Sequence, residues 1–227
     1  MLVAILSDIH SNLPALEAVL TVMEPLCPER VLCAGDIVGY NASPEEVCRS
    51  LAGKKWDIIR GNHDRAVVSG DTSRLKDDAA TAASWTRGLL SDASARFLDG
   101  LSARRLLTIG GRRILLVHGS PSDDDEYVFP MTEEQWPFGN PGADVLVMGH
   151  AHVQWTDRYR GCGLTVLNPG SVGQPRDGDP RAAFATLDTR DLTVRFHRVA
   201  YDVGKAARAV VAAGLPSRFA ERLSIGR

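Results

Sequence analysis

The first sixty residues alternate between short apolar runs and segments whose apolar positions have helical spacing. Asn12 can cap a helix that begins near Pro14, and Ser43 precedes a second helix that leads to Gly53. A strand–helix–strand–helix–strand order predicts a parallel sheet with right-handed crossovers. The apolar runs, which are typical of buried strands, are residues 2–6, 31–34 and 56–59.

The pattern changes in the second half of the chain. Residues 64–100 are typical of helices, with alanine-rich stretches, and Gly110-Gly111-Arg112 separates two apolar runs as in a hairpin. We expect an α/β fold in which two sheets pack together with helices outside, in one domain over residues 1–227. Strands are predicted over residues 105–109, 113–117, 144–148, 153–159, 164–168, 182–187 and 192–198, and closing helices over 202–213 and 216–223.

Five of the six histidines lie in short polar motifs that follow predicted strands. The carboxyl ends of strands converge on one edge of an open α/β sheet, so these distant motifs should lie close together. Burying so many imidazoles and carboxylates without a cation would cost free energy, and the pattern therefore predicts a metal site. The motifs are Asp8-Ile9-His10, Gly35-Asp36, Gly61-Asn62-His63-Asp64, His118-Gly119 and Gly149-His150-Ala151-His152.

Each motif alone has a simpler interpretation. A single histidine at a strand end is more often structural than a ligand, and a Gly-Asp pair is usually a turn. Taken together, the five motifs favour a metal site. The absence of thiolates from the motifs excludes a structural zinc finger. Imidazole, carboxylate and amide donors suit several divalent cations. We favour manganese, with iron, zinc, nickel, cobalt and magnesium as alternatives.

Composition narrows the function class. The 44% hydrophobic and 24% charged residues are typical of a soluble globular protein, and the net charge of −2 argues against a nucleic-acid partner. The four cysteines form no C-x-x-C pair and suggest a reducing compartment. The apolar start is too short for a signal peptide, and no apolar run is long enough to cross a membrane. The expected location is cytoplasmic, without a membrane partner; a homo-oligomer is compatible with the sequence.

The order of the motifs resembles the calcineurin-like metallophosphoesterase superfamily. The match covers residues 8–152 with every ligand position filled, and Asn168-Pro-Gly-Ser-Val-Gly-Gln-Pro-Arg176 resembles a segment of its small single-domain bacterial and archaeal phosphodiesterases. The resemblance implies a four-layer αββα sandwich of two mixed sheets, with two divalent metal ions bridged by Asp36. One ion would be held by Asp8, His10, Asp36 and His152, and the other by Asp36, Asn62, His118 and His150.

The resemblance also implies a mechanism. A hydroxide shared by the two cations would attack phosphorus, and His63 would protonate the leaving oxygen or stabilise the transition state. Together with Asp36 and Asn62, His63 makes up the expected catalytic group. One departure is Gly39, which stands where the protein phosphatase branch has an aspartate that supports this histidine. Gly39 argues against a protein phosphatase or a diadenosine tetraphosphate hydrolase, and it leaves the orientation of His63 unexplained.

The leading hypothesis is a phosphodiesterase acting on small-molecule or nucleotide phosphodiesters. The alternatives are a phosphomonoesterase or protein phosphatase, a nuclease, and a non-catalytic metal-binding scaffold, although a scaffold usually lacks ligands and none is missing here. Asp123-Asp124-Asp125-Glu126 is expected to be a solvated acidic turn. Residues expected to line the cleft, from their nearness to the motifs, are Tyr40, Tyr127 and Arg176.

Overall fold

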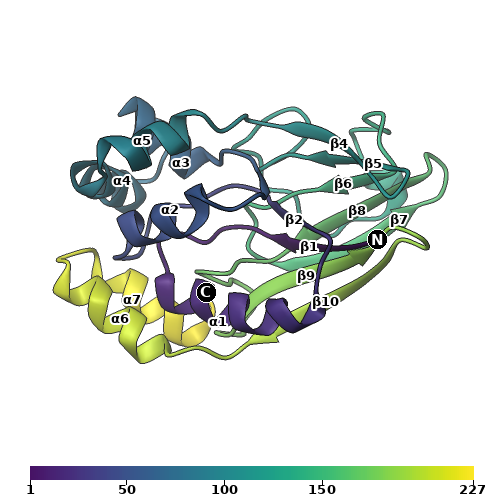
Figure 1. The fold of residues 1–227 in the computed structure, drawn as a ribbon. Helices are drawn as coiled ribbons and strands as arrows, with labels where there is room; N and C mark the ends of the chain where they lie inside the picture. The colour runs from purple at the N-terminus through teal and green to yellow at the C-terminus, as the bar shows by residue number, and fades with distance from the viewer.

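Two five-stranded mixed sheets form the centre of the protein in the computed structural model, which describes residues 1–227 (Figure 1). The strand order is β10-β9-β1-β2-β3 in the first sheet and β4-β5-β6-β8-β7 in the second. The first sheet contains β1 (Leu2–Leu6), β2 (Arg30–Cys33), β3 (Asp57–Ile58), β9 (Ala182–Asp188) and β10 (Thr193–Val199). The second contains β4 (Arg105–Ile109), β5 (Arg112–Leu116), β6 (Val145–Val147), β7 (Gln154–Tyr159) and β8 (Leu164–Pro169).

The helices gather at one end of the sheets and over the outer face of the first sheet (Figure 1). No helix is long and apolar enough to cross a membrane. The α-helices are α1 (Leu13–Met23), α2 (Pro44–Ala52), α3 (Asn62–Ser69), α4 (Asp77–Leu89), α5 (Asp92–Asp99), α6 (Val203–Ala212) and α7 (Ser217–Ile225). Two short 3₁₀ helices are η1 (Glu24–Leu26) and η2 (Glu133–Gln135).

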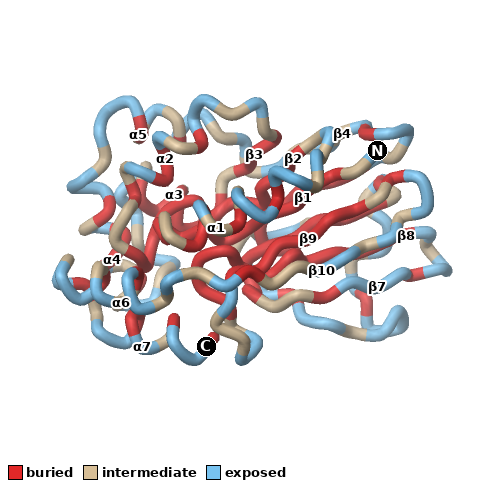
Figure 2. Tube along the Cα trace, turned by 60° about the horizontal axis from the view of Figure 1, so that its bottom comes forward, coloured by how far each residue is buried: buried red, intermediate tan, exposed pale blue.

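The alternation of side chains along the strands builds the core. On β1, Val3 and Ile5 face the second sheet, whereas Ala4 and Leu6 face the helices. All four are fully buried, because a strand in the middle of a covered sheet is apolar on both faces. Figure 2 shows this buried interior along the strands, with exposed residues on the outer sides of the helices and in the turns.

The parallel strands end in register at the helical end. Leu6 of β1 lies opposite Cys33 of β2, and Leu116 of β5 lies opposite Val147 of β6. The polar motifs follow directly after these strands, so the edge at which the strands end brings segments from both sheets together. This is the arrangement that the strand-end motifs predicted.

The predicted α/β fold of two mixed sheets flanked by helices is confirmed. The Asn12 side chain caps α1 by accepting a 3.2 Å hydrogen bond from the Ala15 amide. One boundary differs from the prediction, because α3 begins at Asn62, which places Asn62 and His63 in its first turn. The outer face of the second sheet is covered by residues 119–143, which contain η2 and no α-helix.

Candidate metal centre

The seven predicted metal ligands lie together at the edge where the parallel strands end. They come from the loops after β1 and β2, the first turn of α3, and the loops after β5 and β6. Each side chain is at least nine-tenths buried, although each is polar. Asp8, His10, Asp36, Asn62, His118, His150 and His152 make up this ligand cluster.

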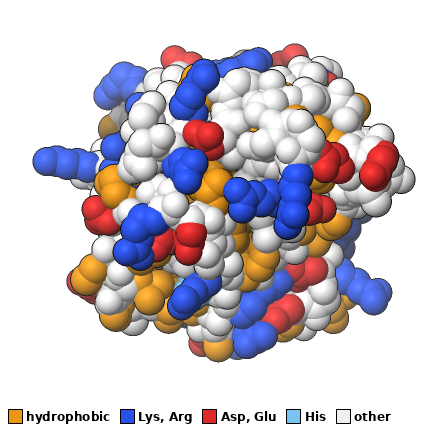
Figure 3. All heavy atoms as spheres, turned by 90° about the vertical axis from the view of Figure 1, so that its right-hand side faces the viewer, with side chains coloured by type: hydrophobic (Ala, Val, Ile, Leu, Met, Phe, Trp, Pro, Cys, Tyr) orange, Lys and Arg blue, Asp and Glu red, His pale blue; other side chains and the backbone are white.

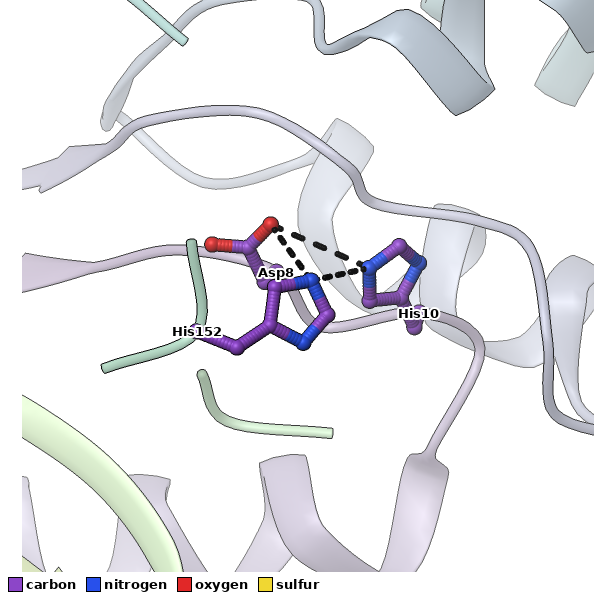
Figure 4. A group of neighbouring side chains, drawn as sticks. All are labelled: Asp8, His10 and His152. Atoms are coloured by element: carbon purple, nitrogen blue, oxygen red, sulfur yellow. Dashed lines mark hydrogen bonds and ion pairs between the residues drawn. The ribbon is translucent and has the colours of Figure 1, made fainter. Parts of the chain in front are cut away.

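One half of the ligand cluster consists of Asp8, His10 and His152 (Figure 4). The Nε2 atoms of the two histidines are 3.1 Å apart, and Asp8 Oδ1 lies 3.2 Å from His152 Nε2 and 3.8 Å from His10 Nε2. The three ligand atoms therefore point at one another (Figure 4). Such a separation between a carboxylate and two imidazoles matches ligands that share one cation.

The other half consists of Asp36, His118 and His150, with Asn62 beside them. Asp36 Oδ2 lies 3.2 Å from His118 Nε2, and Asn62 Oδ1 lies 3.1 Å from the same nitrogen. Asp36 Oδ2 is also 3.5 Å from His10 Nε2, which belongs to the first half. Asp36 thus lies between the two halves, as a bridging carboxylate would.

Backbone carbonyls orient three of the imidazoles. The Nδ1 atoms of His10, His118 and His152 lie 3.1, 2.7 and 2.5 Å from the carbonyl oxygens of Val38, Ala34 and Gln174. An Nδ1–H that donates to a carbonyl leaves Nε2 free to bind a metal. These contacts come from the loop after β2 and the segment after β8, so both sheets help to aim the rings.

Two buried atoms in the ligand cluster lack a hydrogen-bonding partner. They are His150 Nε2 and Asp36 Oδ2, and the latter lies 3.2 Å from His118 Nε2 without the geometry of a hydrogen bond. Buried polar atoms are normally satisfied, and leaving one without a partner costs about 1–3 kcal/mol. Both atoms point into the ligand cluster from the second half, so the donor set fits bound cations, which would satisfy them.

The backbone of the ligand loops is strained. Nine residues other than glycine have positive φ, and five of them are predicted ligands: Asp8, His10, Asp36, His150 and His152. The left-handed region costs such residues of order 1 kcal/mol each and persists where the surrounding structure holds it. Strain concentrated in these loops is typical of a functional site.

The charges of the ligand cluster are coupled. Burial disfavours a charge on His118, yet Asp36 raises its pKa to about 10. Burial alone would raise the pKa of Asp8, but His152 lowers it below the ordinary range. Burial and the neighbouring His118 lower the pKa of His150 to about 3. The carboxylates thus favour positive charge beside them, and a cation bound in the ligand cluster would supply that charge.

Two other contacts bring α3 close to Asp36. The His63 amide donates a 2.9 Å hydrogen bond to Asp36 Oδ1. A Cβ atom on Gly61 would lie 2.1 Å from that same oxygen, so only glycine permits the approach. Asp64 connects two ligand loops, because its side chain accepts hydrogen bonds from the amides of Val38 and Gly61. Burial and nearby Asp36 raise the pKa of Asp64 to about 7.

His63 packs beside the ligand cluster. Its ring centroid is 4.9 Å from that of His10 and 4.5 Å from that of Tyr40. Burial lowers the pKa of His63 to about 4, and its Nδ1 has no hydrogen-bonding partner. A Cβ atom on Gly39 would lie 2.6 Å from Nδ1. The ring therefore packs against Tyr40 and Gly39, and no carboxylate hydrogen-bonds to its Nδ1.

The segment after β8 braces the ligand loops from behind. Ser171 Oγ donates a 2.7 Å hydrogen bond to the Asp8 carbonyl oxygen and accepts one from the Gln174 amide. Asn168 donates a 2.7 Å hydrogen bond to the Gly149 carbonyl oxygen. These contacts give Ser171 a structural role in the turn behind Asp8.

The acidic run after His118 forms a turn in which Asp123 and Glu126 are exposed, as predicted, and it also makes ion pairs that the sequence did not predict. Arg65 of α3 contacts Asp125 at 2.7 Å, and Arg74 contacts Asp123 at 2.9 Å and Asp125 at 2.8 Å. The sequence could not reveal these pairs because the arginines lie about fifty residues away along the chain. The acidic side chains attach the loop that carries Tyr127 to α3 and the segment after it.

The three predicted cleft residues border the ligand cluster. Arg176 donates hydrogen bonds of 3.2 Å to Tyr40 and 3.4 Å to Tyr127, and the Tyr127 ring lies 4.0 Å from that of His150. Sequence reasoning missed other basic residues on the same side, because nothing in the local sequence around them differs from an ordinary helix surface. They are Lys76, Arg218 and Arg222.

Comparisons with known proteins identify the family of this chain. Residues 1–192 match the model of the calcineurin-like phosphoesterase superfamily domain. An uncharacterized protein of Methanocaldococcus jannaschii is 32% identical over 100% of this chain and 98% of its own length. The phosphodiesterase YfcE of Escherichia coli is 28% identical over 83% of this chain and 88% of its own. A metallophosphoesterase from Sphaerobacter thermophilus is 31% identical in structural alignment, with a TM-score of 0.86 over 100% of this chain and 99% of that one.

Proposed function

We propose that this chain, which belongs to the calcineurin-like phosphoesterase superfamily and is a phosphoric ester hydrolase, is a phosphodiesterase. Its substrates would be small-molecule or nucleotide phosphodiesters, and its cofactors two divalent cations. The observation that carries the proposal is the position of Asp36 between two groups of ligand atoms. YfcE, a relative similar over most of the chain, is named a phosphodiesterase, which supports the diester preference.

The donor set suits two cations that share one carboxylate. Asp8, His10 and His152 would hold the first with Asp36, and Asn62, His118 and His150 would hold the second with Asp36. When bound, paired divalent cations supply Lewis acidity, lowering the pKa of a water from 15.7 toward about 7 and neutralising phosphate oxygens. Asn62 contributes a neutral oxygen, which keeps the site cationic enough to attract a phosphate.

His63 acts on the substrate from the edge of this site. Because burial holds its pKa near 4, the imidazole is neutral at pH 7. A neutral ring can still donate a hydrogen bond to an oxygen of the phosphate in the transition state. Packing against Tyr40 fixes the ring, so the donor needs little reorganisation during the reaction.

Gly39 argues against a protein phosphatase, because that branch has an aspartate at this position. The cytoplasmic location and the single domain over residues 1–227 stay predictions.

The decisive experiment is hydrolysis of bis(p-nitrophenyl) phosphate by purified protein with Mn²⁺. We expect turnover that EDTA abolishes and Mn²⁺ restores, with p-nitrophenyl phosphate run in parallel as the monoester. Asp36→Ala should abolish turnover and metal binding, whereas Asp99→Ala, an exposed carboxylate on α5, should change neither. Turnover that survives EDTA or Asp36→Ala would contradict the two-cation proposal, and faster hydrolysis of the monoester would contradict the diester preference.

The balance of charge argues against the nuclease alternative, because the formal net charge is −2. On the face at the end where β1 begins, which Figure 3 shows, lysine and arginine side chains are interspersed with aspartate and glutamate. A nuclease needs many phosphate contacts, so its affinity for DNA falls steeply with salt. A DNA affinity that does not depend on salt would therefore support the small-substrate assignment.

A further inference from the structure

A second cavity adjoins the cleft above the ligand cluster. The cleft is bordered by Asn62, His63 and His150, and its walls include Tyr40 and Tyr127. The same two tyrosines line the second cavity, whose volume is about 200 Å³. The two spaces therefore share a wall and lie next to each other between the ligand cluster and the helices α4 and α7.

The second cavity is lined by positive charge. Four of its eight lining residues are lysine or arginine, and none is acidic: Lys76, Arg176, Arg218 and Arg222. Among these four, only Arg218 has a carboxylate partner, Asp78. The one acidic residue that borders the neighbouring cleft, Asp125, is already paired with Arg65 and Arg74. The protein itself does not neutralise the charge of this cavity.

The surroundings of Arg176 give the strongest indication that the cavity binds an anion. Its guanidinium contacts only neutral groups, namely the hydroxyls of Tyr40 and Tyr127 and the side-chain oxygen of Gln174. Its Nε atom is buried and has no hydrogen-bonding partner. A charge held in this way costs free energy unless an opposite charge pairs with it. An anion bound in the cavity would supply that partner.

We propose that this cationic cavity binds a second phosphate group of the substrate, while the phosphate to be hydrolysed lies at the ligand cluster. The inference rests on the proposed phosphodiesterase function and narrows its substrate class to diesters that carry a further phosphate. A guanidinium group can bind two phosphate oxygens at once, and Lys76 adds a point charge to the lining of the cavity. The tyrosines between the two sites would contact the part of the substrate that links its phosphates.

The test compares matched pairs of substrates on the metal-loaded enzyme. Each pair is a p-nitrophenyl alkyl phosphate diester that ends in either a hydroxyl or a phosphate, with short alkyl chains of increasing length. Because the chain is flexible, one length in the series lets the terminal phosphate reach the cavity. We expect the phosphate-ended diester at that length to have a kcat/KM about tenfold higher, mainly through a lower KM.

Charge removal in the cavity should shrink this preference. Lys76→Gln and Arg222→Gln should each lower the ratio of kcat/KM between the two diesters several-fold. Arg208→Gln, which removes the same charge from the exposed face of α6, should leave the ratio unchanged. The preference should also fall with added salt, because screening weakens contacts with a partly exposed anion.

The outcomes separate the two proposals. If bis(p-nitrophenyl) phosphate is not hydrolysed in a metal-dependent way, the proposed function fails. If it is hydrolysed, but the two diesters react equally at every chain length, the second-phosphate site is wrong while the function stands. An equal loss of preference in Arg208→Gln would also overturn the site, since the effect would then come from overall charge.

Discussion

The two ends of the cleft are built in different ways. The ligand cluster lies on loops that directly follow strands, is almost completely buried, and holds five of the nine non-glycine residues with positive φ. The cationic cavity draws Lys76, Arg218 and Arg222 from the edge of α4 and from α7, on more open surface. In the proposed function, the reaction therefore takes place at the loops that follow the strands, whereas substrate recognition uses residues of α7 and the start of α4 together with Arg176 from the segment after β8.

Removing a side chain of the ligand cluster should have the largest effect on activity. His118→Ala removes a donor of the second half only, since Asp8, His10 and His152 remain. We expect turnover of bis(p-nitrophenyl) phosphate to fall about a thousandfold or more, and metal content to fall from two ions per chain toward one. Metal analysis of the purified variant measures the second effect.

The control is His197→Ala, which removes a histidine that stacks on Phe184 away from the site. It should keep both ions. Loss of both ions in His118→Ala would show that the two halves do not bind metal separately.

His63→Gln should have the next largest effect. We expect kcat to fall about a hundredfold, because the variant loses the imidazole that donates to the phosphate. Metal content should not change, because His63 lies outside the proposed ligand set. Metal analysis checks this, since the His63 ligand atom lies within 4.8 Å of those of His10 and Asp36. A loss of metal in this variant would make His63 a ligand instead.

Gly61→Ala tests how tightly α3 packs against Asp36. The added Cβ atom would lie 2.1 Å from Asp36 Oδ1, while φ of −90° at Gly61 suits alanine, so the clash alone sets the cost. We expect the free energy of unfolding to fall by about 2 kcal/mol, measured by urea denaturation. Gly53→Ala is the matched control, with no atom within 4 Å of its Cβ atom. Equal stability of the two variants would mean that Asp36 moves freely.

The smallest effect should come from loosening the loop that carries Tyr127, whose side chain lines both the cleft and the cationic cavity. Arg65→Gln removes the arginine that attaches the Tyr127 loop through Asp125. We expect a loss of about 1 kcal/mol or less and faster amide hydrogen exchange in residues 119–127. Arg49→Gln, which breaks an exposed pair with Glu45, should leave exchange in this loop unchanged. Unchanged exchange in Arg65→Gln would show that the ion pairs do not hold the loop.

Local sequence patterns anticipated most of the strands and helices, since each depends on nearby residues. Apolar runs located β1 and β2, and the Gly-Gly pair located the hairpin between β4 and β5. The start of α3 was placed two residues late, because Asn62 and His63 read as a polar loop. The turn at the acidic run was predicted, but its ion pairs were not, because the partners Arg65 and Arg74 are remote in sequence.

By itself, the sequence determined which residues can hold metal, because D-x-H, G-N-H-D and H-x-H carry donor atoms at strand ends. Only the tertiary structure decided how those donor atoms are arranged in space, in two groups with Asp36 between them. It also decided that His63 packs against Gly39 and Tyr40, and that Lys76 and Arg222 line the same cavity. The physical reason is that motif chemistry is local, whereas packing and charge balance depend on segments that meet only when the two sheets and their helices assemble.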